Sequence, residues 1–197
     1  MRCIYCNHYI LYNLNDGNLK CANCKRKFSP KKLERKNKIL NSFLNGLTPI
    51  EISKKHNFAY ASVVKEIKNI RIKIAQICEE NFLEKNNILE FEEYLYIPNN
   101  DIYKAENFLT IDYGDIYNIM LSDMKNYESL SEKEIKSMFL QRRIIKYQNH
   151  IKIQQFWDYF EEFMKKFRGV NKQNFFYYLK EAEFRFNNFK IDIIDII

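Results

Sequence analysis

The sequence predicts an α+β protein built from a small N-terminal head and a larger mixed domain. Three observations lead to this prediction: two closely spaced cysteine pairs near the N-terminus, β-hairpin patterns in the middle of the chain, and two stretches with helical apolar spacing at its end. The chain has 197 residues, of which 46% are hydrophobic, which suffices for packed cores and argues against global disorder.

Charge is distributed unevenly along the chain. Residues 1–78 contain 16 lysines and arginines against 4 acidic residues, a net charge of +12, whereas residues 79–197 contain 16 against 21, a net charge of −5. This favours a polyanionic partner for the head alone, with a solvated lysine-rich surface as the alternative. The sequence has no run of about eighteen apolar residues and no signal peptide, so we expect a soluble, cytoplasmic protein with no membrane partner.

Cys3, Cys6, Cys21 and Cys24 form two CxxC pairs separated by fourteen residues. Two thiolates three positions apart can face one ion, and two such pairs complete the tetrahedral shell of a structural Zn²⁺ with no open position for catalysis. Disulfides and a redox CxxC pair are the alternatives, but nothing suggests secretion and neither pair lies in a βαβ pattern. We therefore predict a zinc ribbon over residues 1–28, with a strand and turn between the pairs.

A basic segment with a helix start follows the cysteines. Ser29-Pro30 supplies an N-cap and a proline at the first helical position, and Gly46 ends the helix. The apolar face of this helix consists of Leu33, Ile39, Leu40, Phe43 and Leu44. The basic residues expected to contact DNA here are Lys25, Arg26, Lys27, Lys31 and Lys32.

Residues 48–78 have the pattern of a helix-turn-helix, and we place this DNA-binding domain at residues 29–80. Thr48-Pro49-Ile50-Glu51 is a capping box that starts a short helix ending at His56, Asn57-Phe58 makes the turn, and a longer helix runs from about Tyr60 to about Cys78. The predicted core consists of Ile52, Phe58, Val63, Val64 and Ile67. In this motif the second helix enters the major groove with its N-terminal residues first. The residues of that helix expected to contact double-stranded DNA are Tyr60, Ala61, Ser62, Lys65, Lys68, Asn69 and Arg71.

The remainder, which we place in one domain at residues 88–197, mixes strands and helices. After a polar linker at 79–87, residues 88–97 resemble a strand, and residues 108–111 and 116–121 flank a hairpin turn at 112–115. A helix is predicted around residues 131–143. Two amphipathic helices, separated by Gly169-Val170, close the chain. Cys78 lies on an apolar helix stripe, which favours a buried core cysteine over a reactive one.

The C-terminal segment resembles the end of ISXO-type insertion-sequence transposases. Gly169-Val170-Asn171-Lys172, then five residues, then YLKEAEFRFN at residues 178–187 is similar to that family's GVSK and YLDEFxFRFN motifs at the same spacing. Upstream, residues 153–157 (IQQFW) resemble the family's NGIESFW. The family also begins with a zinc ribbon followed by a helix-turn-helix. The resemblance covers both ends of the chain well and the middle poorly.

The resemblance implies a bacterial, nucleoid-associated DDE transposase with an RNase H-like domain, contracted here, in which three acidic residues hold two Mg²⁺ ions. It also implies a homo-oligomer holding two DNA ends, and no small-molecule substrate. The family-equivalent catalytic positions are Glu92, in place of an aspartate, Asp123, and Gln154, in place of an acid. Glutamine lacks the charge that Mg²⁺ needs, so we expect DNA binding without efficient cleavage, and Mg²⁺ only if the protein is catalytically active.

Three functions therefore compete. The first is a DNA-binding, catalytically degenerate transposase relative that recognises insertion-sequence ends. The second is an active transposase with realigned acids, using Glu92, Asp123 and a nearby glutamate such as Glu161 or Glu162, although a solvated helix face is the plainer interpretation of those two. Asp112 and Asp115 are further candidates that a hairpin turn explains more simply. The third is a zinc-ribbon module for protein interaction or transcription regulation.

Overall fold

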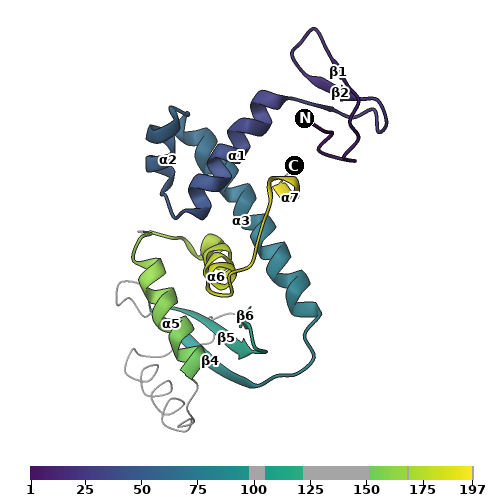
Figure 1. The fold of residues 1–197 in the computed structure, drawn as a ribbon. Coiled ribbons are helices and arrows are strands. Elements are labelled where there is room, and N and C mark those ends of the chain that lie inside the picture. Colours follow the sequence, from purple (N-terminus) through teal and green to yellow (C-terminus); the bar gives the residue numbers. More distant parts are fainter. Residues whose placement is uncertain (98–104, 122–150, 168, 197) are drawn as a thin grey trace. The chain divides into compact units, whose positions relative to one another are not determined.

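The computed structural model describes residues 1–97, 105–121, 151–167 and 169–196. These residues form two small three-stranded antiparallel sheets and six helices (Figure 1), so the predicted mixture of strands and helices is confirmed. The chain divides into two compact units. The first contains residues 1–73 and 190–197, and the second contains residues 74–189. The first boundary falls inside the helix over Tyr60–Leu83, and the C-terminal residues belong to the first unit. The sequence instead predicts domain boundaries in the loops near residue 28 and at residues 80–88.

The first unit begins with a sheet of three short strands in the order β1 (Leu11–Asn13), β2 (Leu19–Cys21) and β3 (Lys27–Phe28). The turn between β1 and β2 uses Gly17 at φ +75°, and the Asp16 carboxylate accepts a hydrogen bond from the backbone N–H of Asn18 at 3.0 Å. A positive φ favours glycine because that residue lacks a Cβ. The predicted strand and turn between the cysteine pairs are therefore confirmed.

Helix α1 (Pro30–Leu44) starts and ends where its capping residues predict. The Ser29 hydroxyl accepts from the backbone N–H of Lys32 at 3.4 Å, and Gly46 at φ +81° follows the last turn. Ile39, Leu40 and Phe43 are buried. These residues lie on one face of α1 at helical spacing, and this buried face packs in the core of the first unit.

Helices α2 (Pro49–His56) and α3 (Tyr60–Leu83) form the predicted helix pair. The capping box is present, because the Thr48 side chain accepts from the Glu51 N–H while the Glu51 carboxylate accepts from the Thr48 N–H at 2.7 Å. Asn57 ends α2 in the left-handed conformation at φ +53°, which asparagine tolerates better than most residues. The Phe58 N–H donates to the Ser53 carbonyl, and the Ser53 hydroxyl donates to the Phe58 carbonyl at 2.7 Å, so the turn is fixed from both sides.

Two predictions about α3 are wrong in detail. Ile52, Val63 and Ile67 are buried as expected, but Val64 is 40% exposed. The buried face of α3 contains Val63, Ile67 and Ile70, which are spaced four and three residues apart. Val64, one position after Val63, therefore lies outside this face. The helix also continues to Leu83 through part of the predicted linker at 79–87. Phe82 explains the extension, because its ring packs 5.5 Å from that of Tyr117 and keeps another helical turn in contact with the second unit's sheet.

The second unit is a sheet in the order β4 (Glu90–Tyr96), β5 (Glu106–Asp112) and β6 (Ile116–Met120), with helices α5 (Ile151–Met164) and α6 (Lys172–Phe186) packed on it (Figure 1). The predicted hairpin and the two amphipathic helices are confirmed. Alternate strand residues face these helices. The shared core consists of Tyr94, Phe108 and Ile116 from the sheet, Ile153, Phe156, Trp157, Phe160, Phe163 and Met164 from α5, and Phe175, Leu179 and Ala182 from α6.

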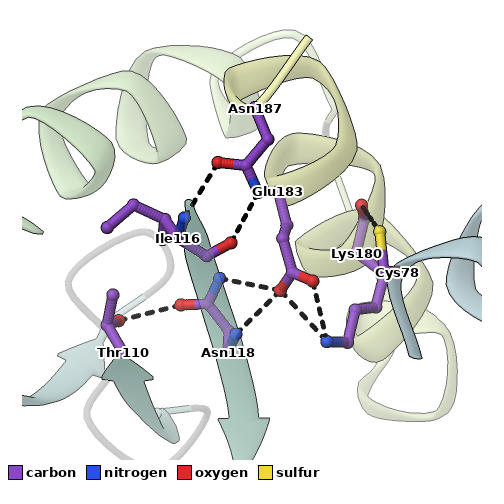
Figure 2. Close-up of polar contacts among 7 residues, drawn as sticks. All are labelled: Cys78, Thr110, Ile116, Asn118, Lys180, Glu183 and Asn187. Carbon is purple, nitrogen blue, oxygen red and sulfur yellow. Dashed lines mark hydrogen bonds and ion pairs between the residues drawn. The ribbon is translucent and has the colours of Figure 1, made fainter. Parts of the chain in front are cut away.

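Side chains of α6 cover the free edge of the sheet, strand β6 (Figure 2). The Asn187 amide accepts from the Ile116 backbone N–H at 2.9 Å and donates to the Ile116 carbonyl at 2.6 Å. The Glu183 carboxylate accepts from the Asn118 backbone N–H at 2.8 Å and from its side-chain amide at 3.0 Å. An edge strand has unpaired backbone groups, and here two side chains satisfy part of them. These contacts lie in the segment that resembles the transposase C-terminus.

Glu183 is also part of a buried ion pair. Lys180 donates to both of its carboxylate oxygens at 3.0 Å, and both side chains are almost fully buried. Burial raises the pKa of Glu183, and the Lys180 charge and the Asn118 donors oppose this rise. Cys78, on α3, donates to the Lys180 carbonyl at 3.6 Å (Figure 2), and burial likewise raises the pKa of its thiol. The prediction that Cys78 is a core residue is confirmed.

A short helix, α7 (Ile193–Ile196), follows the two predicted helices and belongs to the first unit. Lys36 of α1 donates to the Ile196 carbonyl at 3.3 Å, and Ile191 is buried. The predicted helix at 131–143 lies outside the described residues. The described part of the second unit contains three antiparallel strands, so an RNase H-like sheet remains a prediction. In the described part of the chain, none of the helices combines the length and the apolar character that crossing a membrane requires.

Candidate metal centre and nucleic-acid surface

The four head cysteines converge on one point. Their Sγ atoms all lie within 4.8 Å of one another, and the Cys3–Cys24 and Cys6–Cys21 distances are 3.6 Å. A tetrahedral Zn²⁺ with Zn–S distances near 2.3 Å places its sulfurs about 3.8 Å apart. A disulfide would need about 2.05 Å, and all four cysteines are free thiols. The cluster can therefore hold a metal ion such as zinc, as the CxxC spacing predicts.

The two CxxC loops have the same backbone geometry. In the first, the Cys3 N–H donates to the His8 carbonyl and the Asn7 N–H donates to the Cys3 carbonyl; in the second, Cys21 bonds in the same way to the Arg26 carbonyl and the Lys25 N–H. The residue after each pair, Asn7 or Lys25, is left-handed at φ +58° or +61°. Each of these two similar loops brings two thiols to the common cluster, which the sequence spacing alone does not show.

The ligand thiols are held by backbone donors as well as by the loops. The Asn23 N–H donates to the Cys21 sulfur at 3.4 Å. A backbone hydrogen bond from His8 lowers the pKa of Cys6 to about 6, with smaller contributions from the neighbouring cysteines and with desolvation opposing them. The local electrostatics therefore favour the thiolate form of Cys6, which is the form that binds a metal. The contribution of His8 comes from its backbone, and its imidazole is not part of the cluster.

The exposed face of α3 carries most of the residues that the helix-turn-helix pattern assigned to DNA. Tyr60, Ala61, Lys65, Lys68 and Asn69 are exposed, whereas Ser62 is half-buried at the margin. The opposite face, with Val63, Ile67 and Ile70, is buried. Because buried and exposed positions follow the helical spacing, the first three turns of α3 present one face that carries exposed lysines to solvent.

The surroundings of Arg71 differ from those expected of a DNA contact. It is half-buried, and its guanidinium lies 5.8 Å from the ring centroid of Phe43 on α1. Arg35, which was not a candidate, similarly lies 5.0 Å from the ring of Phe58 in the turn between α2 and α3. Cation–π contacts of this kind bind the helices together, so part of the positive charge of the head serves packing.

The basic residues between the ribbon and α1 surround a cleft of about 360 Å³. Lys27 and Lys32, both predicted contacts, are exposed at its lining, and the half-buried Lys36 lies there as well. Lys25 and Lys31 are exposed beside it, and the Arg26 guanidinium lies 5.0 Å from the Tyr5 ring. Lys36 is not among the predicted DNA contacts, because its closeness to Lys27 arises only when the ribbon packs on α1.

The family-equivalent catalytic positions do not assemble in the described residues. Glu92 lies on β4 opposite Thr110, on the face where Tyr94 packs against α5. Gln154 is exposed on α5, and its amide donates to Asp158 one turn later at 2.9 Å. Asp123 lies outside the described residues. Within those residues, the four cysteines are the one group of three or more His, Cys, Asp or Glu side chains near enough to share an ion.

The alternative acids have structural partners. Asp112 accepts from the Gly114 N–H at 2.7 Å and closes the β5–β6 turn, and Asp115 pairs with Lys85 at 2.8 Å. Glu162 is exposed and pairs with Lys165 on the same helix, and Glu161 accepts from the Tyr94 hydroxyl. These contacts agree with the simpler structural interpretations.

The comparisons with known proteins do not identify a family. No protein-family model, no curated protein and no solved structure matches this chain. The resemblance to ISXO-type transposases therefore stays a prediction carried by the residues quoted above.

Proposed function

We propose that the first unit binds double-stranded DNA, with structural zinc in the cysteine cluster and the N-terminal half of α3 in the major groove. One observation carries the proposal. Helix α3 follows a tight turn held by two hydrogen bonds between Ser53 and Phe58, and it exposes Tyr60, Lys65 and Lys68 on the face opposite its buried core. A helix-turn-helix requires this combination, because the turn sets the angle of the second helix and that helix must present its first turns to the bases.

The basic surroundings support the same proposal. The exposed lysines at the cleft between the ribbon and α1 add positive charge outside α3. Contacts from such side chains to phosphates fix the position of a protein on DNA without reading its sequence. The head thus combines a helix suited to reading base edges with lysines suited to holding the backbone.

We further propose that the whole chain is a transposase-related protein that recognises insertion-sequence ends and cleaves them poorly or not at all. The C-terminal resemblance supports the relationship, and the position of Gln154 supports the loss of cleavage, because an exposed amide bonded to Asp158 offers no negative charge to a divalent cation. On this proposal the second unit is a contracted RNase H-like domain.

Salt dependence tests DNA binding. We expect the affinity of the full chain for a mixed-sequence duplex of about 25 base pairs to fall steeply between low and physiological salt, because phosphate contacts release counterions. The double substitution Lys65→Ala/Lys68→Ala should lower the salt slope by about two, or about one for each lysine. Lys165→Ala/Lys166→Ala removes two exposed lysines from the second unit and should leave the slope unchanged. A salt-independent affinity would exclude DNA as the partner.

A cleavage assay tests the loss of catalysis. We expect no strand cleavage of a plasmid carrying the sequence that the head selects, with either Mg²⁺ or Mn²⁺. Cleavage that Glu92→Gln abolishes would show that the acids are realigned and active, and would restore the second interpretation given by the sequence.

One observation favours a second function for the ribbon. Tyr9, Ile10 and Tyr12, on and before β1, are 71%, 41% and 56% exposed. Aromatic residues are enriched in protein–protein interfaces, so this hairpin suits contact with a partner protein. Substitution of all three by serine should leave DNA affinity unchanged if the hairpin serves that second role.

A further inference from the structure

The exposed face of α3 contains an apolar strip that the lysines do not explain. Residues four apart form two neighbouring rows on the helix surface, Tyr60-Val64-Lys68 and Ala61-Lys65-Asn69. Tyr60 is 54% exposed and Val64 is 40% exposed, and Ala61 is exposed beside them. The core beneath is complete without them, because Val63 and Ile67 are fully buried on the other side. The strip is therefore apolar surface on the face that points away from the unit's core.

The charges around this strip select the kind of partner. Lys65 and Lys68 flank Val64 and are exposed. The single acidic residue between positions 60 and 69 is Glu66, which is half-buried and lies 4.0 Å from the Lys36 ammonium on α1. The exposed face is thus apolar along its middle and positive at its margin. A polyanion with an apolar group on its accessible surface complements this pattern.

Double-stranded DNA has one such group in the major groove. Each base pair presents hydrogen-bond donors and acceptors there, and thymine alone adds a 5-methyl group, which alanine, threonine and other apolar side chains contact. A valine cannot form a side-chain hydrogen bond. On a groove-facing helix it can therefore distinguish bases through this methyl group, by favouring thymine over cytosine.

We infer that Val64, together with Ala61 and the ring of Tyr60, contacts thymine methyl groups and makes the head selective for thymine at the positions beneath α3. The inference rests on the proposed DNA binding and specifies which chemical group of the DNA is read. Lys65 and Lys68 then hold the phosphates on either side, while the apolar strip provides the base discrimination.

The experiment begins by selecting the preferred site of the full chain from a pool of random 25-base-pair duplexes. The selected duplex is then synthesised with thymine or with uracil, which differs only by the methyl group. We expect the uracil duplex to bind about fourfold more weakly for each methyl contacted, since burying one such group contributes about 0.8 kcal/mol. Replacing Val64 by alanine should reduce this ratio towards one.

Controls separate the contact from the fold. Val64→Ala places a better helix former at an exposed position, so its melting temperature should equal that of the unaltered chain or exceed it. Ile50→Ala removes an exposed apolar side chain, 55% exposed, from α2 in the same unit and should leave the thymine-to-uracil ratio intact. Val64→Thr keeps one methyl group and should retain part of the discrimination.

The outcomes distinguish this inference from the function on which it rests. Equal affinity for the thymine and uracil duplexes, or a ratio that Val64→Ala does not change, overturns the thymine contact and leaves DNA binding standing. If the chain binds no duplex, or binds duplexes with an affinity that does not depend on salt, the thymine contact and the proposed DNA binding are both overturned.

Discussion

Asn57 shows how one residue determines the geometry of the helix pair. It adopts a left-handed backbone at the end of α2, and the next residue is bonded from both sides to Ser53. Left-handed backbone disfavours β-branched side chains most strongly, because their Cβ atoms crowd the following carbonyl. The angle between α2 and α3 therefore depends on an asparagine or a glycine at this position.

We expect Asn57→Gly to change the free energy of unfolding by only a few tenths of a kcal/mol, whereas Asn57→Val should cost about 1–2 kcal/mol. Chemical denaturation measures both. Asn45→Val provides the control, because Asn45 caps α1 at φ −75°, where valine meets no such strain. Equal costs at positions 45 and 57 would contradict the role assigned to the left-handed backbone.

Cys6 gives the metal site a characteristic pH dependence. The pKa of its thiol is lowered to about 6, primarily by the backbone hydrogen bond from His8. Above that pH the thiolate is already formed, and below it zinc must displace a proton from Cys6. We therefore expect the zinc affinity of the apo-protein to fall more steeply with decreasing pH once the pH drops below about 6. Competition titrations against a chromophoric chelator measure this, and a constant slope through that range would contradict it.

At the scale of the element, α6 is held to the sheet by buried polar contacts. Removing one partner of a buried ion pair leaves the other charge without compensation. We expect Glu183→Ala to lower the free energy of unfolding by about 3–5 kcal/mol, because Lys180 stays buried and the Asn118 donors lose their acceptor.

Two comparisons identify the cause of that loss. The double substitution Lys180→Met/Glu183→Leu should recover a large part of the stability, because apolar residues of similar size often replace a buried pair well. Glu162→Ala removes an exposed glutamate paired with Lys165 and should change the free energy of unfolding little, because solvent screens an exposed pair. A double variant as unstable as Glu183→Ala would show that the Asn118 hydrogen bonds, and not the unpaired lysine, dominate.

Local sequence signals predicted many of the elements and the metal site. Ser29, Thr48 and Gly46 set helix ends through contacts within a few residues, and the CxxC loops direct their thiols locally. The sequence predicts both Val63 and Val64 as core residues because adjacent positions fit the helical period similarly, and only tertiary packing distinguishes them. Local sequence does not predict the roles of Glu183 and Asn187, because their partners on β6 lie about seventy positions away in the sequence.

At the scale of the whole molecule, the chain divides into two compact units, and the possible reporter groups are distributed between them. The single tryptophan, Trp157, is buried in the second unit, where it stacks on Tyr94 and donates to the Thr110 hydroxyl at 2.9 Å. The four cysteine ligands all lie in the first unit. Tryptophan emission therefore reports on the second unit alone.

We expect a zinc chelator to unfold the ribbon and to weaken DNA binding, because small metal domains depend on their ion for folding. The emission maximum of Trp157 should not move during this treatment. Near-ultraviolet circular dichroism and fluorescence, recorded on the same sample, provide the measurement. A red shift of Trp157 on chelation would contradict independent folding of the two units.

The α6 contacts with β6 bear on how this chain can change over evolutionary time. Gln154 is exposed and bonds to Asp158 on its own helix, so we expect substitutions there to leave the fold intact. Glu183 and Asn187 satisfy buried groups and shield a strand edge, so mutations there expose the chain to misfolding and aggregation. If the proposed relationship to transposases holds, mutational drift would erase a catalytic centre and preserve the C-terminal motif, because folding depends on that motif.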